Sequence, residues 1–203
     1  MPGIETILVD IDGPVCNFLK QYSYYYNIDT GIYVDPSNIS SYNLKLSMPT
    51  TPKYKYLYDK DFYKDIEFIP NAIDSINILK DKYNIIFTTS CVTKESMFGK
   101  YNLIERTFPW FDVVKNWIVI PRKQYLNYPN SVIVDDNPHM FLDGCQTRHK
   151  IVFALKHNSH LEPKLYDLRT DDWNEIVNFI EKVVLTSESS SSLLLKHITK
   201  GSF

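Results

Sequence analysis

Four aspartates stand in two close pairs, and each pair follows a run of apolar residues. Asp10 and Asp12 end the stretch ILVDID, and Asp135 and Asp136 end the stretch SVIVDD. Side chains alternate along a strand, so Asp10 and Asp12 lean to the same face. Parallel strands bring their carboxyl ends to one edge of a sheet, where open α/β sheets bind ligands. The two pairs therefore predict up to four converging carboxylates, whereas D-x-D-G by itself fits a turn about as well.

Converging carboxylates predict a bound cation. Carboxylates that lie close together repel one another, and each raises the pKa of its neighbours. A hard divalent cation removes this conflict, and Mg²⁺ typically binds one or two carboxylates together with a substrate phosphate. We therefore expect Mg²⁺ as the cofactor, held between Asp10 and the pair Asp135 and Asp136.

Two further groups of residues suit a phosphate. The apolar run NIIFTTS ends in Thr89 and Ser90 just before a candidate helix, and hydroxyls with free N–H groups at such a place bind phosphate. Capping of that helix by Ser90 or Thr93 explains the same residues without a ligand. Arg122 and Lys123 follow the run WIVI and would balance the charge of the aspartates, although by themselves they fit an exposed surface pair.

Together these residues predict phosphoryl transfer. Asp10 attacks phosphorus and forms an aspartyl-phosphate, while Thr89 and Lys123 hold the phosphoryl oxygens. Asp12 protonates the leaving oxygen and then activates the water that hydrolyses the intermediate. For this role we expect Asp12 to hold a proton near neutral pH, which crowding by the other carboxylates favours.

The elements that must position these residues alternate along the chain. Uniformly apolar runs predict buried strands at 4–10, 84–90, 117–120, 131–136 and 150–155. Helical patterns lie between or after them, following residue 17, at 71–82, near 93–106 and from about residue 172. This alternation predicts an α/β fold with a Rossmann-like parallel sheet that is covered on both faces.

Residues 20–69 do not fit the alternation. This stretch holds most of the tyrosines of the chain and also contains prolines. Structureless loops of this length are uncommon, so we predict a small inserted subdomain at 20–69, within a core formed by 1–19 and 70–185. Residues 186–203 form a C-terminal tail whose serine-rich start predicts poor order.

Composition limits the partners. The net charge of −2 over 203 residues provides no positive field for nucleic acid, and no apolar run reaches the length of a membrane span. The first candidate strand starts near residue 4, which leaves no room for a targeting peptide, and three widely spaced cysteines favour a reducing compartment. We expect a cytoplasmic protein (in the host cytoplasm if it comes from a phage) with no nucleic-acid or membrane partner. A homodimer stays open.

The motifs resemble a known group of phosphatases. D-I-D-G-P-V, T-T-S, a basic residue and V-D-D-N-P are similar, in this order, to the four motifs of the haloacid dehalogenase superfamily. A closer resemblance is to the 5′(3′)-deoxyribonucleotidase family, carried by the stretches 10–18, 62–72, 87–90, 152–161 and 171–173. It implies a Rossmann-like core of the haloacid dehalogenase type with a small helical cap inserted after the first strand. It also implies Mg²⁺-dependent removal of phosphate from a small-molecule partner, a deoxynucleoside monophosphate.

The resemblance implies roles for the aspartates. Asp10 corresponds to the nucleophile, and Asp12 corresponds to the general acid and base, with its backbone carbonyl on the metal. Asp136 corresponds to the main metal ligand, supported by Asp135.

The resemblance also implies substrate contacts. Thr89 and Ser90 correspond to phosphate and substrate contacts, and cap aromatics stack on the base. Our candidates for these aromatics are Phe18, Tyr33 and Tyr42.

The lysine of the third motif is less well defined. Eleven residues separate Lys123 from Asp135, about two more than in the family. An ungapped match instead puts Gln124 at the lysine position and Arg122 on a neighbouring arginine.

Two other functions stay open from sequence. One is a phosphatase of the same superfamily that acts on a phosphoprotein or a polynucleotide end. The other is a nucleotide-binding protein that has lost activity. An aromatic cap argues against large substrates, and the presence of all four aspartates argues against lost activity.

Overall fold

The computed structural model describes residues 3–50 and 54–198, and its centre is one parallel sheet. The strands run in the order β3-β2-β1-β4-β5-β6, and every pairing is parallel. Their bounds are β1 Thr6–Asp10, β2 Asn84–Thr89, β3 Trp117–Val119, β4 Asn127–Asp135, β5 Gln146–Phe153 and β6 Leu168–Thr170. The predicted α/β fold with a parallel sheet is confirmed. Only β6 was missed, because its sequence LRT has no apolar run.

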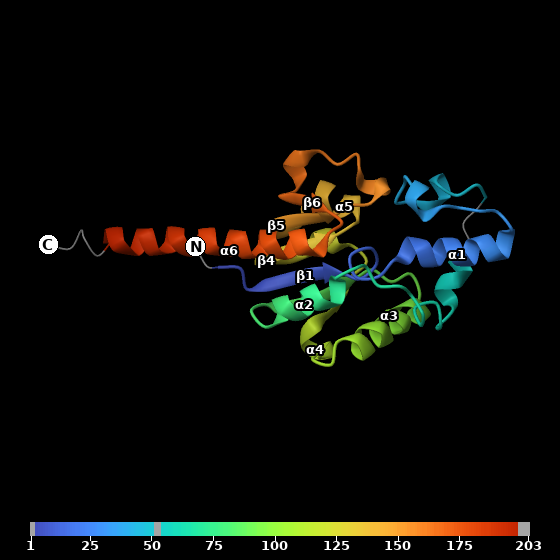
Figure 1. Ribbon diagram of the computed structural model, residues 1–203, viewed down its shortest axis with the longest axis horizontal. Coiled ribbons are helices and arrows are strands. Elements are labelled where there is room, and N and C mark those ends of the chain that lie inside the picture. Colours follow the sequence, from blue (N-terminus) through green and yellow to red (C-terminus); the bar gives the residue numbers. More distant parts are fainter. Residues whose placement is uncertain (1–2, 51–53, 199–203) are drawn as a thin grey trace.

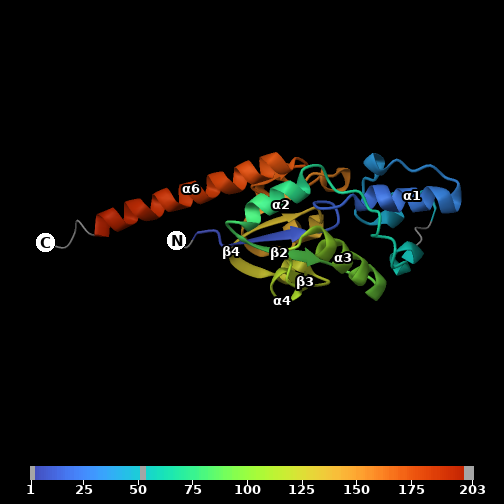
Figure 2. The same cartoon turned by 60° about the horizontal axis from the view of Figure 1, so that its bottom comes forward.

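Helices cover both faces of this sheet. Their bounds are α1 Phe18–Thr30, α2 Ala72–Lys80, α3 Lys94–Thr107, α4 Val113–Asn116, α5 Pro138–Leu142 and α6 Trp173–Ile198. In Figure 2, α2 and α6 lie side by side, and the two helices are in contact. The alternation of side chains in each strand separates two apolar clusters. In β1, Ile7 and Val9 join the cluster of α2, α3 and α6, whereas Leu8 joins the cluster that contains α5.

The order of the strands places the two acidic pairs beside each other. From β1 the chain builds β2 and β3 on one side, and it then returns to place β4 on the other side of β1. The register sets Val9 beside Val134, so that β1 and β4 end at the same height. Adjacent strands whose connections run in opposite directions form a topological switch point, which is where such sheets bind ligands.

The segment between β1 and α2 contains helical turns. Besides α1 it forms 3-10 turns at Pro36–Asn38, Leu44–Leu46 and Tyr54–Tyr58. Figure 1 shows these elements (blue to cyan) beyond the carboxyl end of β1. Asn17 caps the helix by accepting a hydrogen bond from the Lys20 backbone amide, so α1 starts at Phe18, as predicted for a helix after residue 17. It thus begins two residues before the predicted start of the inserted subdomain at residue 20. The division into core and inserted cap stays a prediction, and we use the word cap for residues 18–69.

The cap contacts the core on two sides. On one side, the Thr93 hydroxyl donates a hydrogen bond to the Leu57 carbonyl, and Arg106 donates to the Tyr63 carbonyl at 3.0 Å. On the other side, Lys156 Nζ lies 3.1 Å from Asn38 Oδ1. The space between these two sets of contacts opens onto the ends of β1 and β4.

The last helix is longer than the sequence pattern indicated. Figure 1 shows α6 running past the end of the sheet opposite the cap, and the helix ends at Ile198. The serines at the start of the predicted tail continue α6 as helix. Poor order of the tail stays a prediction, and its residues 199–203 lie outside the described residues. Within residues 3–50 and 54–198, no helix has both the length and the apolar content to cross a membrane.

Candidate active site

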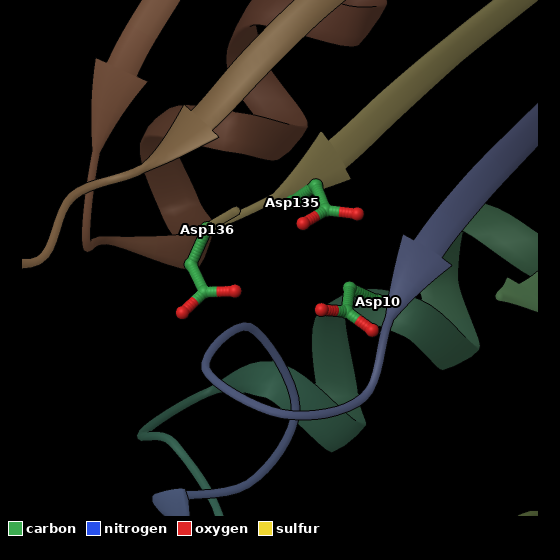
Figure 3. Close-up of side chains that lie close together, drawn as sticks. All are labelled: Asp10, Asp135 and Asp136. Carbon is green, nitrogen blue, oxygen red and sulfur yellow. The ribbon is translucent and has the colours of Figure 1, made fainter. Parts of the chain in front are cut away.

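Three of the four aspartates come together at the edge of the sheet. Asp10 ends β1, Asp135 ends β4, and Asp136 follows directly, as Figure 3 shows. One carboxylate oxygen from each lies within 4.8 Å of the others. All three residues are buried. Asp12 is not part of this group, because its side chain turns toward α3.

Lys123 lies among these carboxylates. Its Nζ is 2.5 Å from Asp10 Oδ1 and 2.8 Å from Asp135 Oδ2, and its side chain is 3% exposed. A 3-10 turn over Lys123–Tyr125 directs it inward. Of the three residues considered for the third motif, Lys123 is the one that the structure brings to the carboxylates.

The other two candidates for that position lie elsewhere. Arg122 is exposed, and its guanidinium donates to the Tyr125 hydroxyl at 3.2 Å. Gln124 Nε2 lies 3.5 Å from Asp143 Oδ2, away from the aspartate group. Consecutive residues of this tight turn point in different directions, and Lys123 is the one that faces the aspartates. A phosphate contact of Arg122 stays a prediction.

Burial raises the pKa of all three aspartates of the group. Burial, followed by the Asp135 charge, raises the pKa of Asp10 to about 7 despite the opposing effect of Lys123. Burial also raises the pKa of Asp135, although Lys123 lowers it in part. The pKa of Asp136 is raised by burial as well, with a hydrogen bond from His157 acting against it. One lysine therefore does not neutralise the group, which has the character of a cation site.

The two strand-end aspartates differ in which oxygens are free. Asp10 Oδ1 accepts the Ile11 amide at 2.8 Å and pairs with Lys123. In the described part of the chain, no hydrogen bond or ion pair engages the other oxygen, Oδ2 of Asp10. Asp135 uses both oxygens, one for the Asn137 amide at 2.8 Å and the other for Lys123. Asp10 is thus available to a ligand, whereas Asp135 holds Lys123.

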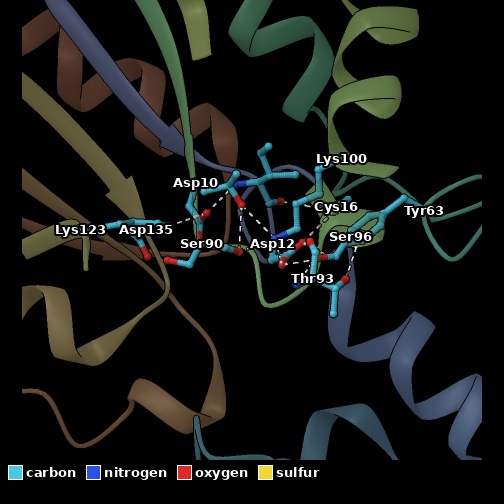
Figure 4. A network of polar contacts seen from close by, with 12 residues as sticks. Asp10, Asp12, Cys16, Tyr63, Ser90, Thr93, Ser96, Lys100, Lys123 and Asp135 are labelled. Carbon is cyan, nitrogen blue, oxygen red and sulfur yellow. Dashed lines mark hydrogen bonds and ion pairs between the residues drawn. The ribbon is translucent and has the colours of Figure 1, made fainter. Parts of the chain in front are cut away.

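Asp12 forms a separate network with residues that the sequence did not single out. Lys100 Nζ lies 2.7 Å from Asp12 Oδ2, 2.9 Å from Thr89 Oγ1 and 2.9 Å from the Ser90 carbonyl. The Tyr63 hydroxyl lies 3.2 Å and 3.3 Å from the two Asp12 oxygens. Figure 4 shows this network beside the Asp10 group. The contact with Lys100 is an ion pair that holds one oxygen of the Asp12 carboxylate. The role of Asp12 as general acid and base stays a prediction.

Lys100 left a signal in the sequence. It belongs to the buried stripe of α3, whose members are Ser96, Gly99, Lys100, Leu103 and Ile104. This spacing of three and four residues is that of a core-facing stripe, in which a lysine is unusual. A lysine on such a stripe indicates a buried anionic partner.

Thr89 and Ser90 both line the cavity described below, as the phosphate-site prediction requires. Thr89 is buried, and its hydroxyl accepts the hydrogen bond from Lys100. The Ser90 hydroxyl donates to the Ile120 carbonyl at 3.0 Å. Their contact with phosphate stays a prediction.

Gly13 allows Asp136 to approach the loop after β1. Its φ is +97°, and a Cβ at this position would lie 2.8 Å from Asp136 Cγ. We predict that Gly13→Ala destabilises the fold by about 1–3 kcal/mol and also lowers activity strongly, because Asp136 must shift.

Gly144 provides the matched control for Gly13. Its φ is +81°, but a Cβ there meets nothing within 4 Å. Gly144→Ala should cost similar stability in chemical denaturation and leave kcat/KM nearly unchanged. Equal losses of activity in both variants would show that backbone strain, and not the displacement of Asp136, is responsible.

A cavity of about 490 Å³ lies between the aspartates and the cap. Its core side includes Asp10, Asp12, Thr89, Ser90, Lys123, Asp136 and His157. Its cap side includes Phe18, Tyr42, Leu44, Tyr54, Leu57 and Tyr63. One end is therefore charged and the other largely apolar and aromatic, within the size range of small-molecule sites.

Two of the three aromatic residues predicted to stack on the base line the cavity. Phe18 and Tyr42 line the cavity, and the ring of Tyr42 lies 5.5 Å from that of His157 in an edge-on arrangement. Tyr33 is 80% exposed and does not line the cavity. The side chain of the next residue, Val34, is buried instead, and stacking of Tyr33 on a base stays a prediction. Tyr54, which we did not predict, lines the cavity instead.

The sequence profile of one protein family matches almost the whole chain. This family is described as 5′ nucleotidase, deoxy (pyrimidine), cytosolic type C protein (NT5C), and the match covers residues 4–187. The chain belongs to this family. The predicted resemblance to deoxyribonucleotidases is thereby confirmed. A comparison with curated proteins found no match.

Solved structures of haloacid dehalogenase-like hydrolases share the fold. A hydrolase from Streptococcus pneumoniae has 17% identity and a TM-score of 0.63, with 88% of this chain and 99% of that chain covered. A hydrolase from Bacillus subtilis, solved bound to magnesium, has 12% identity and a TM-score of 0.54, with 89% and 100% covered. The haloacid dehalogenase type of the core is confirmed, and membership of the nucleotidase family supports a phosphatase.

The metal-free protein should lose stability as the pH rises through about 7. The pKa of Asp10 rises from 3.8 to about 7 on folding, so the folded protein binds this proton more tightly than the unfolded chain. The resulting stabilisation is complete below the ordinary pKa and is lost as the pH passes the raised one. We expect the free energy of unfolding of the wild type in EDTA, minus that of Asp10→Asn, to decrease between about pH 5 and about pH 8. A constant difference across this range would contradict the prediction.

Proposed function

We propose that this protein is a Mg²⁺-dependent phosphatase that removes the phosphate from (deoxy)nucleoside 5′-monophosphates through an aspartyl-phosphate intermediate. The observation that carries the proposal is the cavity with Asp10, Asp12 and Lys123 at one end and Phe18, Tyr54 and other cap side chains at the other. A nucleoside monophosphate has the same division into a charged end and a flat aromatic end. Membership of the nucleotidase family supports the same substrate class.

Asp10 is the proposed nucleophile. Its Oδ2 has no partner among the described residues, while Lys123 and the Ile11 amide hold Oδ1. The carboxylate is therefore fixed in orientation with one oxygen free to attack phosphorus. Lys123 places a positive charge at the same point, where negative charge accumulates on the phosphoryl oxygens.

Asp12 is the proposed general acid and base. It lines the cavity, and the Tyr63 hydroxyl and Lys100 hold its carboxylate in place. To give a proton to the leaving oxygen, Asp12 must exchange its contact with Lys100. Lys100 already contacts Thr89, so a phosphate bound at Thr89 offers this ammonium an alternative anion.

The residues present fit a hard divalent cation. Asp10 and Asp136 line the cavity, and Asp135 completes the group of buried carboxylate oxygens. Such donors suit Mg²⁺. The hydrolase from Bacillus subtilis that shares the fold has been solved bound to magnesium. When bound, Mg²⁺ would offset the repulsion between the carboxylates and the phosphate.

The cap supports a small substrate. The Tyr42 and Leu44 side chains close the cavity from one part of the cap, and Tyr54 and Leu57 close it from another. Walls on two sides of the charged end favour a small substrate over a folded phosphoprotein or a duplex end. The proposed flat partner for the aromatic rings is the nucleobase.

A panel of phosphomonoesters tests the proposal. The panel contains the 5′-monophosphates of the deoxynucleosides and ribonucleosides, deoxynucleoside 3′-monophosphates, a phosphopeptide, a DNA 3′-phosphate and an aryl phosphate, each with Mg²⁺ and with EDTA. We expect kcat/KM to be highest for a nucleoside 5′-monophosphate and to vanish with EDTA. A phosphopeptide or DNA end hydrolysed best would overturn the substrate class. Inactivity on every compound would favour a nucleotide-binding protein.

A further inference from the structure

A buried histidine, His157, contacts Asp136. His157 Nε2 lies 3.2 Å from Asp136 Oδ2 and 3.1 Å from the Asp136 carbonyl oxygen. The side chain of His157 is 2% exposed. One buried ring nitrogen therefore faces both the carboxylate and the backbone of the same residue.

The chemistry of these contacts identifies the proton on His157. The Asp136 backbone carbonyl can only accept a hydrogen bond, as can its carboxylate when ionised, so Nε2 carries the hydrogen and donates it. The other ring nitrogen, Nδ1, is buried and has no hydrogen-bond partner among the described residues. His157 thus directs its one satisfied donor at Asp136.

A second layer holds the backbone of Asp136. The Asn158 side-chain amide, Nδ2, donates to the Asp136 backbone carbonyl at 2.9 Å and to the Phe153 backbone carbonyl at 2.8 Å. Arg169 in turn donates to Asn158 Oδ1 at 3.1 Å. This layer joins the end of β4 to the end of β5 and to β6.

Asp136 needs such support for an electrostatic reason. It is buried next to Asp10 and Asp135, whose charges push it away. Lys123 lies within ion-pair distance of Asp10 and Asp135, and no described lysine or arginine forms an ion pair with Asp136. Lys123 acts on Asp136 only from a distance, and His157 is the described side chain that contacts the Asp136 carboxylate directly.

We propose that His157 is a positioning residue that fixes the Asp136 carboxylate for metal binding, through a hydrogen bond from its Nε2. The inference rests on the proposed function, because it assumes that the aspartate group binds a divalent cation. Donors of this kind orient a ligating carboxylate, and their loss typically weakens metal affinity about 10–100-fold. His157 acts on the affinity for metal and makes no contact with the reacting atoms.

Three substitutions separate the hydrogen bond from the shape of the side chain. Glutamine places an amide nitrogen near the position of Nε2 and keeps the donor. Asparagine is too short to reach Asp136, and leucine has no donor. The matched control is His160→Leu, at a nearby exposed histidine.

Metal binding is measured directly and through activity. Mn²⁺ replaces Mg²⁺ as a spectroscopic probe, and its free concentration is followed by electron paramagnetic resonance in the absence of substrate. We expect His157→Leu and His157→Asn to weaken Mn²⁺ binding about 10–100-fold and to raise the Mg²⁺ concentration for half-maximal hydrolysis by a similar factor. His157→Gln should stay within about 3-fold of the wild type, and His160→Leu should not change. Thermal denaturation in EDTA establishes that each variant is folded.

The outcomes distinguish this inference from the proposed function. A wild type that binds no Mn²⁺ and has no Mg²⁺-dependent activity would overturn both. A wild type that binds Mn²⁺ normally, together with His157→Leu that binds it equally well, would overturn only the role of His157. Equal weakening in the Gln and Leu variants would also reject it, because the donor would then not be the cause.

Discussion

Replacing Asp10 by asparagine should lower kcat for every hydrolysed phosphomonoester by about 10⁴-fold or more. Asparagine keeps the shape of the side chain and the acceptor for the Ile11 amide. It removes the negative oxygen that attacks phosphorus, and no other carboxylate takes its place, since Asp135 is fully buried and engaged with Lys123 and Asn137. Steady-state kinetics with Mg²⁺ and an aryl phosphate measure the loss.

The same variant should fold at least as well as the wild type without metal. Asp10→Asn removes one of three buried carboxylates that repel one another, while Lys123 keeps Asp135 as a partner. Stability is measured by chemical denaturation in EDTA. Substantial residual turnover by a well-folded Asp10→Asn would be incompatible with Asp10 as the nucleophile. It would favour a mechanism in which water attacks directly.

Replacing Lys123 by methionine should destabilise the metal-free protein by about 3–5 kcal/mol and also remove most activity. The Lys123 ammonium is buried at 2.5 Å from Asp10 and 2.8 Å from Asp135. Methionine has a similar unbranched stem but leaves these carboxylates without their cation. Burial lowers the pKa of Lys123, but the two aspartates outweigh this effect and raise it overall, so the wild-type lysine stays charged.

Magnesium offers a second test of this electrostatic argument. A divalent cation should restore part of the stability lost in Lys123→Met, because it supplies positive charge to the same carboxylates. Arg122→Met is the matched control, since Arg122 is adjacent in sequence but exposed. It should change the free energy of unfolding by no more than about 0.5 kcal/mol. Similar losses in both variants would mean that the buried position of Lys123 has no special importance for stability.

The amino-acid sequence determined the fold class and the place of the acidic residues. Uniformly apolar runs that alternate with helical patterns indicate buried strands of a covered parallel sheet, and parallel strands end at one edge. The sequence therefore predicted Asp10, Asp135 and Asp136 at one edge of the sheet, and the strand order placed β1 and β4 side by side. The composition of residues 20–69 likewise predicted an insertion after the first strand, and its division from the core stays a prediction.

Only the tertiary structure decided which partners surround these aspartates. Lys100 reaches Asp12 from α3, Lys123 reaches Asp10 from a 3-10 turn, and His157 reaches Asp136 from the loop after β5. Each contact joins residues far apart in the sequence, and its geometry depends on how a helix or turn packs against the sheet. Local periodicity says which face of an element is buried, but it does not say what that face meets. For this reason the carboxylates were predictable and the groups that hold and neutralise them were largely not.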